Sequence, residues 1–192
     1  MHEMSELEKY IQSYFAVNRN EISNISACFQ TRSIKKGDFF LKSGRDSQQL
    51  GFVQSGILRE YILADGKEIT KWISTQGYFV VDLSSFLFGQ LARWNIQALT
   101  DCELFVIDRK DYQNLDQVVE GWAKLEKLFL ARCFTVLEDR IVSQLSMSAP
   151  ERYQQFFLHN PELFNQVPLQ YIASMLGMTP ETLSRLRKKG AH

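Results

Sequence analysis

The stretch VPLQYIASMLGMTPETLSRLRKKGAH, near the end of the chain, predicts two short helices joined by a tight turn. We expect the first helix over 169–176 and the second over 180–189. Gly177 falls where such a turn requires a positive φ, which glycine adopts without steric cost. Pro180 suits the first turn of a helix, and Thr179 before it is a favourable N-cap. This stretch therefore predicts a helix-turn-helix.

The two predicted helices have one apolar side and one polar, basic side. The apolar side would form a shared core around Ala173, a small residue where the helices cross; its other members are Ile172, Leu176, Met178, Leu183 and Leu186. The outward side of the second helix carries Glu181, Thr182, Ser184, Arg185, Lys188 and Lys189. Arg reads guanine and Glu accepts from cytosine N4 in a major groove, while Lys binds phosphates. The pattern favours DNA binding over the alternative, a helical hairpin with a solvated basic tail.

The composition adds a cellular setting but no partner. Lys plus Arg and Asp plus Glu both total 22 in 192 residues, so the overall charge gives no sign of nucleic acid. The cysteines, Cys28, Cys102 and Cys133, are three and widely spaced, which argues against a disulfide framework. The start of the chain lacks the features of a signal peptide, and no run is long and apolar enough for a membrane span. We expect a cytoplasmic protein.

Between Thr31 and Leu104 the pattern is that of many short strands. Apolar or alternating runs such as ILREYIL and EITKWIS are divided by turn residues, and Asp65-Gly66 is a strong hairpin signal. Helical spacing precedes this stretch, and from Asp108 onward the spacing is helical again. The fold class is therefore predicted as α+β, with a small β-roll of the jelly-roll type.

A long helix is predicted from Gln117 to about Ser146, and a helix of this length usually packs along a partner. The expected domains are 1–115, a β-roll effector-type domain with leading helices; 116–146, a dimerisation helix; and 147–192, a DNA-binding domain.

The order of these segments resembles the cyclic-AMP receptor protein and FNR (Crp/Fnr) family of transcription regulators. The resemblance rests on IASMLGMTPETLSRLRKK, on IKKGDFFLKSGRDSQQLGFVQSGILREYILADGKEI and on TDCELFVIDRKDYQNL. It implies a double-stranded β-helix domain that resembles cyclic-nucleotide-binding domains, a dimerisation helix and a winged-helix-like helix-turn-helix domain. It also implies a homodimer on a near-palindromic operator in double-stranded DNA, with RNA polymerase as a further partner.

By position, the resemblance assigns base contacts to Glu181, Thr182 and Arg185, and phosphate or base contacts to Thr179 and Ser184. Pro180 stands where many members have a basic base-reading residue. The sequence printed ends at His192, so the wing or extra helix of many members is expected to be short or missing.

The resemblance also locates a possible effector pocket at Val81, Asp82, Leu83, Arg93 and Trp94. Members that bind cyclic nucleotides have Gly-Glu-Leu and then Arg-Ser or Arg-Thr followed by Ala; here Asp82 replaces the Glu and the Arg is displaced by one place. In a strand, that displacement turns a side chain to the opposite face. The expected effector is therefore unknown and not cyclic AMP.

No cofactor or metal is expected. Three cysteines are too few for a four-thiolate iron–sulfur cluster, and His2, His159 and His192 all lie outside the roll. Two other functions remain open: a small-molecule-binding β-roll with a vestigial helix-turn-helix, and a cupin-like enzyme. The second is disfavoured because the roll lacks His and the spacing assembles no nucleophile–base pair. We therefore expect a regulator rather than an enzyme.

Overall fold

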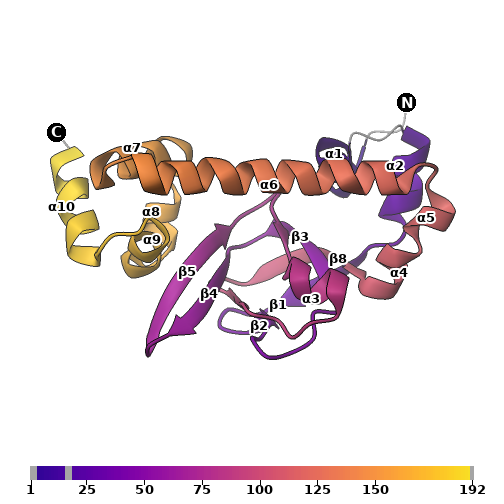
Figure 1. Ribbon diagram of the computed structural model, residues 1–192, viewed down its shortest axis with the longest axis horizontal. Coiled ribbons are helices and arrows are strands. Elements are labelled where there is room, and N and C mark those ends of the chain that lie inside the picture. Colours follow the sequence, from indigo (N-terminus) through magenta and orange to yellow (C-terminus); the bar gives the residue numbers. More distant parts are fainter. Residues whose placement is uncertain (1–3, 16–18, 191–192) are drawn as a thin grey trace. The chain divides into compact units, whose positions relative to one another are not determined.

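A computed structural model describes residues 4–15 and 19–190 (Figure 1). The strands are β1 (Gln30–Ile34), β2 (Phe39–Leu41), β3 (Gln49–Ser55), β4 (Leu58–Ala64), β5 (Lys67–Ser74), β6 (Phe79–Val80), β7 (Asn95–Ala98) and β8 (Cys102–Asp108). The helices are α1 (Glu6–Phe15), α2 (Arg19–Ser26), α3 (Leu83–Phe88), α4 (Arg109–Gln113), α5 (Leu115–Val118), α6 (Trp122–Ser146), α7 (Ala149–His159), α8 (Leu163–Gln166), α9 (Leu169–Met175) and α10 (Pro180–Gly190).

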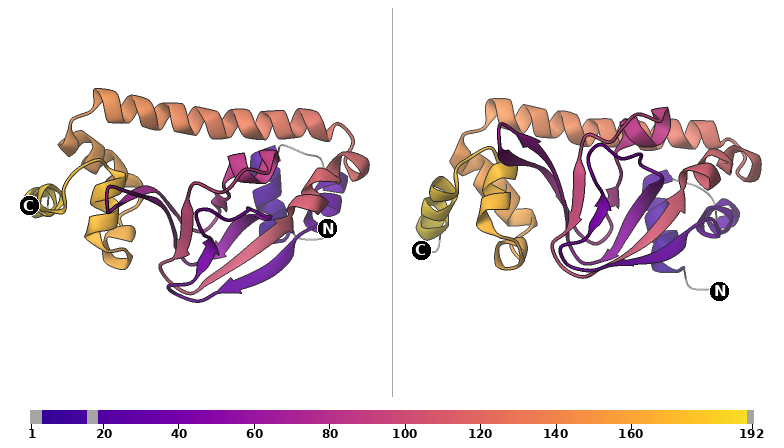
Figure 2. Two further views of the ribbon diagram at one scale, coloured as in Figure 1. Left: turned by 60° about the horizontal axis from the view of Figure 1, so that its bottom comes forward. Right: turned by 90° about the horizontal axis from the view of Figure 1, so that it is seen from below.

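The strands form two four-stranded sheets, ordered β1-β8-β3-β6 and β2-β7-β4-β5. Strand β8 pairs antiparallel with both β1 and β3. Alternate residues of β3 serve two cores: Leu50 and Phe52 pack with the helical side, whereas Val53 belongs to the apolar interior of the roll. The α+β class and the antiparallel β-roll predicted from the sequence are confirmed, and Figure 2 shows the sheets from two further sides.

The turn between β4 and β5 is the predicted hairpin turn. Asp65 has φ +50° and Gly66 has φ +73°, so both central residues lie in the left-handed region that a two-residue hairpin loop requires. Because the two-residue loop joins β4 directly to β5, residues 61–73 form a β-hairpin. Residues near its turn pair with residues that are close to them in sequence.

The leading helices pack through aromatic side chains. Helix α1 buries Leu7, Ile11 and Phe15. The Phe15 ring stacks on Phe129 at 4.8 Å between centroids and lies 5.2 Å from Trp122, both on the first half of α6. This aromatic contact joins helices more than 100 residues apart in sequence.

The long helix starts later than the sequence pattern indicated. The pattern predicted one helix from 117, but α5 ends at Val118 and α6 begins at Trp122. Gly121 has φ +72° between them, which no residue in a right-handed helix adopts. Helix α6 still has 25 residues and a length of about 37 Å.

The chain divides into two compact units. One consists of 1–60 and 74–134, and contains most of the roll, the leading helices and the first half of α6. The other consists of 61–73 and 135–192, and contains the β4–β5 hairpin, the second half of α6 and α7–α10. The domain boundaries at 115/116 and 146/147 stay predictions. Among the described residues, no helix is long and apolar enough to cross a membrane.

Candidate nucleic-acid interface

Helices α9 and α10 are joined by a tight turn of the kind expected. Gly177 has φ +66°, and the backbone N–H of Thr182 donates to the Thr179 hydroxyl at 3.2 Å, which caps the start of α10. Ala173 and Leu183 are fully buried where the helices meet. The small residue at position 173 therefore permits the close approach of the two helices that its position in the sequence predicted.

The polar side of α10 faces outward. Glu181, Arg185, Lys188 and Lys189 are exposed, and Ser184 is half-buried. Together with two apolar neighbours they line one shallow surface, here named the α10 surface: Leu169, Pro180, Glu181, Ser184, Arg185, Lys188 and Lys189. Five of the seven residues predicted to bind DNA are thus gathered on one face.

The remaining two predicted residues lie at the start of α10. Thr179 is exposed and Thr182 is half-buried, and their hydroxyls lie 3.3 Å apart. Their side chains organise the beginning of the helix, where backbone N–H groups point outward and attract anions. The sequence did not indicate that Leu169 and Pro180 would extend the same surface.

Not every basic residue of α10 faces outward. The Arg187 guanidinium lies over the Phe164 ring of α8, 5.7 Å from its centroid. The last turn holds Arg187, Lys188 and Lys189, where positive charge is favourable near the carbonyl end of a helix. On α10, Arg187 therefore faces α8, whereas Lys188 and Lys189 face outward.

The acidic member of the surface stays ionised at neutral pH. The pKa of Glu181 is lowered, first by the hydrogen bond from its own backbone N–H and then by the Thr179 hydroxyl. As a carboxylate it is an acceptor for a donor such as the cytosine amino group.

Side chains from α6 and α7 hold the turn between α9 and α10. Arg152 on α7 donates from Nε to the Leu176 carbonyl at 2.9 Å and from a terminal nitrogen to the Gly177 carbonyl at 3.4 Å. Arg140 on α6 donates to the Met175 carbonyl at 3.0 Å. These carbonyls lack partners within the helix because it ends there. Sequence reasoning missed both arginines.

In the roll, Asp82 is committed to the backbone. It is buried, and its two carboxylate oxygens accept from the N–H of Ser85 at 3.1 Å and from the N–H of Arg93 at 2.8 Å. It thereby caps α3 and joins that helix to the segment before β7. Because Asp82 is almost completely buried, its carboxylate is not open to a ligand hydroxyl.

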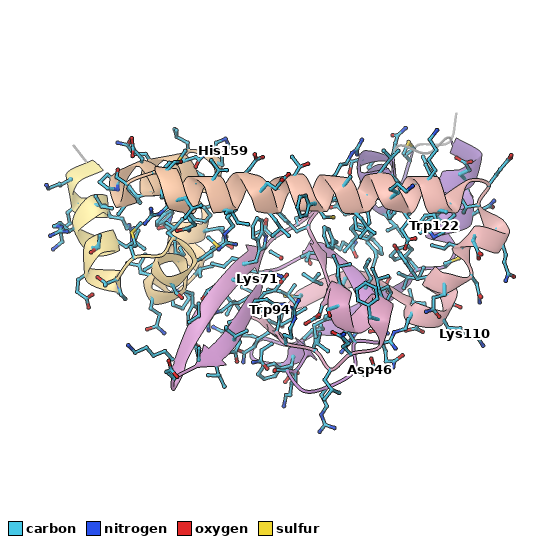
Figure 3. All side chains as sticks on the ribbon, in the orientation of Figure 1. Asp46, Lys71, Trp94, Lys110, Trp122 and His159 are labelled. Atoms are coloured by element: carbon cyan, nitrogen blue, oxygen red, sulfur yellow. The ribbon has the colours of Figure 1, made fainter. Side chains whose placement is uncertain are left out.

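The other predicted pocket residues point in different directions. Ala92 is buried in the roll interior, whereas Arg93 is exposed and lies over the Trp94 ring at 5.7 Å (Trp94 is labelled in Figure 3). Val81 is buried, and Leu83 packs against the same core cluster. Arg93 thus occupies the face opposite to the interior, as its one-place displacement predicted.

The cysteines are protonated thiols at neutral pH. Burial is the main cause that raises the pKa of the Cys28, Cys102 and Cys133 thiols. For Cys133 the pKa is raised to about 11. In the part of the chain that the structure describes, no group of three or more His, Cys, Asp or Glu is placed to hold a metal ion. His2 and His192 lie outside the described residues.

A β-roll domain followed by a long helix and a helical pair is the architecture that these observations define. Residues 31–117 match the Cyclic nucleotide-binding domain family. The chain is similar to the c-di-GMP responsive global regulator CLP of Xanthomonas campestris, with 18% identity, TM-score 0.68 and coverage of 91% of this chain and 92% of that one.

Two further solved structures have the same arrangement. One is FixK2 of Bradyrhizobium japonicum, with 18% identity, TM-score 0.68 and coverage of 84% and 83% of the two chains. The other is a protein of Eubacterium rectale described as of the Crp/Fnr family, with 24% identity, TM-score 0.70 and coverage of 94% and 87%. Comparison with curated protein sequences gave no match.

Residues 31–117 therefore match a cyclic nucleotide-binding domain. Among the solved structures with the same fold, the Eubacterium rectale protein is described as a transcriptional regulator of the Crp/Fnr family and CLP as a global regulator. The resemblance recognised from the sequence is confirmed at the level of the fold.

Proposed function

We propose that the protein is a sequence-specific DNA-binding transcription regulator of the Crp/Fnr type, with α10 in the major groove. The α10 surface carries this proposal. It presents Arg185, Lys188 and Lys189 on one exposed face of a helix that is narrow enough for the groove. The helix is capped and held by a buried core, so the face that it presents outward is fixed.

We further propose that the protein acts as a homodimer through α6. Four large apolar side chains recur on one side of this helix and remain exposed in a single chain; they are Phe134, Leu137, Ile141 and Leu145. Their spacing of three and four residues places them in one stripe. A second copy of the same helix would cover that stripe and place two α10 helices on a two-fold symmetric operator.

The effector domain is proposed not to respond to cyclic AMP. The Asp82 carboxylate is engaged by two backbone donors, and Arg93 lies on the exposed side of its segment. The phosphate of a cyclic nucleotide needs a cation that points into the pocket, and the exposed Arg93 side chain does not supply it. A DNA-binding regulator implies a cytoplasmic location, and RNA polymerase is a further partner in this proposal.

The first experiment is selection of bound sequences from a random duplex library, with and without cyclic AMP. Recovery of a near-palindrome without nucleotide, with half-sites about one helical turn apart, is the expected result. Recovery with cyclic AMP alone would show that the effector assignment is wrong. No enriched sequence in either condition, together with ligand binding by the roll, would instead favour a small-molecule-binding module.

The selected site then allows a test of Arg185. Arg185→Ala should weaken binding by about 1–3 kcal/mol and relax base preference at one position of each half-site. Arg187→Met is the matched control because it removes one positive charge from the same helix, on the side that faces Phe164. Normal operator binding by Arg185→Ala would show that α10 has been assigned the wrong role.

A further inference from the structure

Arg140 connects the β4–β5 hairpin with the end of α9. Its guanidinium donates one hydrogen bond to the backbone carbonyl of Lys71 on β5 and another, at 3.0 Å, to the carbonyl of Met175. The same group lies over the Trp72 ring, 5.0 Å from its centroid. All of these residues belong to one compact unit, and Lys71 is labelled on the hairpin in Figure 3.

A further hydrogen bond joins the hairpin directly to α9. The backbone N–H of Thr70 on β5 donates to the Ser174 hydroxyl of α9 at 2.9 Å, and Thr70 is almost completely buried. The hairpin therefore contacts Ser174 of α9 directly and is linked to Met175 through the Arg140 guanidinium. Its contact with α9 is specific in register rather than a loose apolar association.

The chemistry of the guanidinium explains why one residue can serve both segments. Arg has five donors in a rigid planar fork, whereas the Lys ammonium is a compact charge without fixed donor directions. The Met175 carbonyl lies at the end of α9, where unpaired carbonyls and the helix dipole favour a cation. Arg140 can thus satisfy an acceptor on β5 and an acceptor on α9 at the same time.

We propose that Arg140 is a positioning residue that fixes the direction of α10 through the hairpin. This inference rests on the proposed function, because the consequence of the position is DNA recognition. Met175 is followed directly by the turn that leads into α10, so a displacement at its carbonyl is passed to the reading helix over four residues. Arg140 does not line the α10 surface, and its effect on DNA is indirect.

Arg152 is a control for Arg140, because it supports the turn between α9 and α10 through contacts outside the hairpin. Its contacts are with the Leu176 and Gly177 carbonyls and with Met147, and none of these residues is in the hairpin. Arg132 provides a second control on α6 itself. It donates to the carbonyls of Ser13 and Tyr14 of α1 and belongs to the other compact unit.

The test compares Arg140→Met, Arg152→Met and Arg132→Met in the full chain, since each variant loses one positive charge. Hydrogen exchange measured by mass spectrometry without DNA reports on the contact. Arg140→Met should raise exchange at least tenfold in both 67–73 and 172–178. Arg152→Met should raise it around the turn and leave 67–73 unchanged, and Arg132→Met should change neither segment.

The second readout is affinity for the selected operator against affinity for random duplex DNA. Arg140→Met should weaken operator binding about tenfold or more and change binding to random DNA less than threefold, since the cations of the α10 surface are retained. Arg132→Met should change neither. Arg140→Lys keeps the positive charge but lacks the planar guanidinium. Its affinity for the operator should lie between those of the wild type and Arg140→Met, and this variant keeps the test available if Arg140→Met folds poorly.

Three results would overturn the proposal. Faster exchange confined to 172–178 in Arg140→Met would show that Arg140 caps α9 without involving the hairpin. An unchanged ratio of operator to random-DNA affinity would show that the contact does not position α10. A wild-type chain that selects no operator would overturn the proposed function and the positioning role, while the exchange data would still show whether Arg140 links the two segments.

Discussion

Truncation of Ile141 tests whether the apolar stripe of α6 is a dimer interface. In a single chain 59% of the Ile141 surface is exposed. Full burial of an Ile side chain contributes about 1.5–3 kcal/mol, so burial of the exposed part contributes about 1 kcal/mol in each copy. A two-fold interface contains the residue twice, and Ile141→Ala should therefore weaken dimerisation by about 2 kcal/mol, or roughly 30-fold in Kd.

Sedimentation equilibrium over a range of protein concentrations measures this change. Val136→Ala is the matched control: Val136 is half exposed, but it lies five residues from Ile141 and therefore on the other side of the helix. We expect less than a threefold change in Kd for the control. Alanine is a strong helix former, so neither substitution should unwind α6. Equal effects of the two substitutions, or a wild type that remains monomeric, would refute the assignment of the stripe.

Three other perturbations test the local geometry. Gly177→Ala forces a side chain into φ +66° at a cost of about 1–2 kcal/mol, so Tm should fall by about 2–8 °C; Gly177→Asn should cost less, and an unchanged Tm would contradict the turn geometry. Asp82→Ala leaves one buried and one partly buried N–H group without an acceptor, so urea unfolding should show that the free energy of unfolding falls by about 2–4 kcal/mol, and by less for Asp82→Asn. With its pKa raised to about 11, Cys133 has about one thiolate in 1,000 at pH 8. Iodoacetamide should therefore label it slowly in the folded chain and rapidly in urea, whereas rapid labelling of the folded chain would argue for a reactive thiol.

The features that the sequence predicted correctly depend on local chemistry. Asp65-Gly66 determines its own backbone conformation, and Gly177 and Thr179 determine the end of one helix and the start of the next. The apolar positions of α9 and α10 follow helical spacing, and Ile172, Leu176 and Leu183 are buried accordingly. Such signals are readable because each residue acts within a few positions of itself.

The features that the sequence did not predict depend on distant backbone groups. Arg140 and Arg152 bind carbonyl oxygens, which every residue has, so the identity of the partner leaves no trace in the sequence. Strand β1, QTRSI, has few apolar residues, so its sequence gives a weak strand signal. Its backbone pairing with β8 is what identifies it as a strand. The break before α6 had one signal, Gly121, but a single glycine is also tolerated inside a helix.

The salt dependence of DNA binding should depend on which basic side chains of α10 face outward, rather than on how many basic residues the helix has. Each phosphate contact contributes about 0.9 to the slope of log K against log salt. Lys188 is exposed on the α10 surface, and Lys188→Met should reduce the slope by about 1.8 in a dimer. The Arg187 guanidinium lies over Phe164, so Arg187→Met should leave the slope unchanged although it removes the same charge. Equal slopes for the two variants would mean that net charge in this segment, and not the orientation of α10, governs the interaction with phosphates.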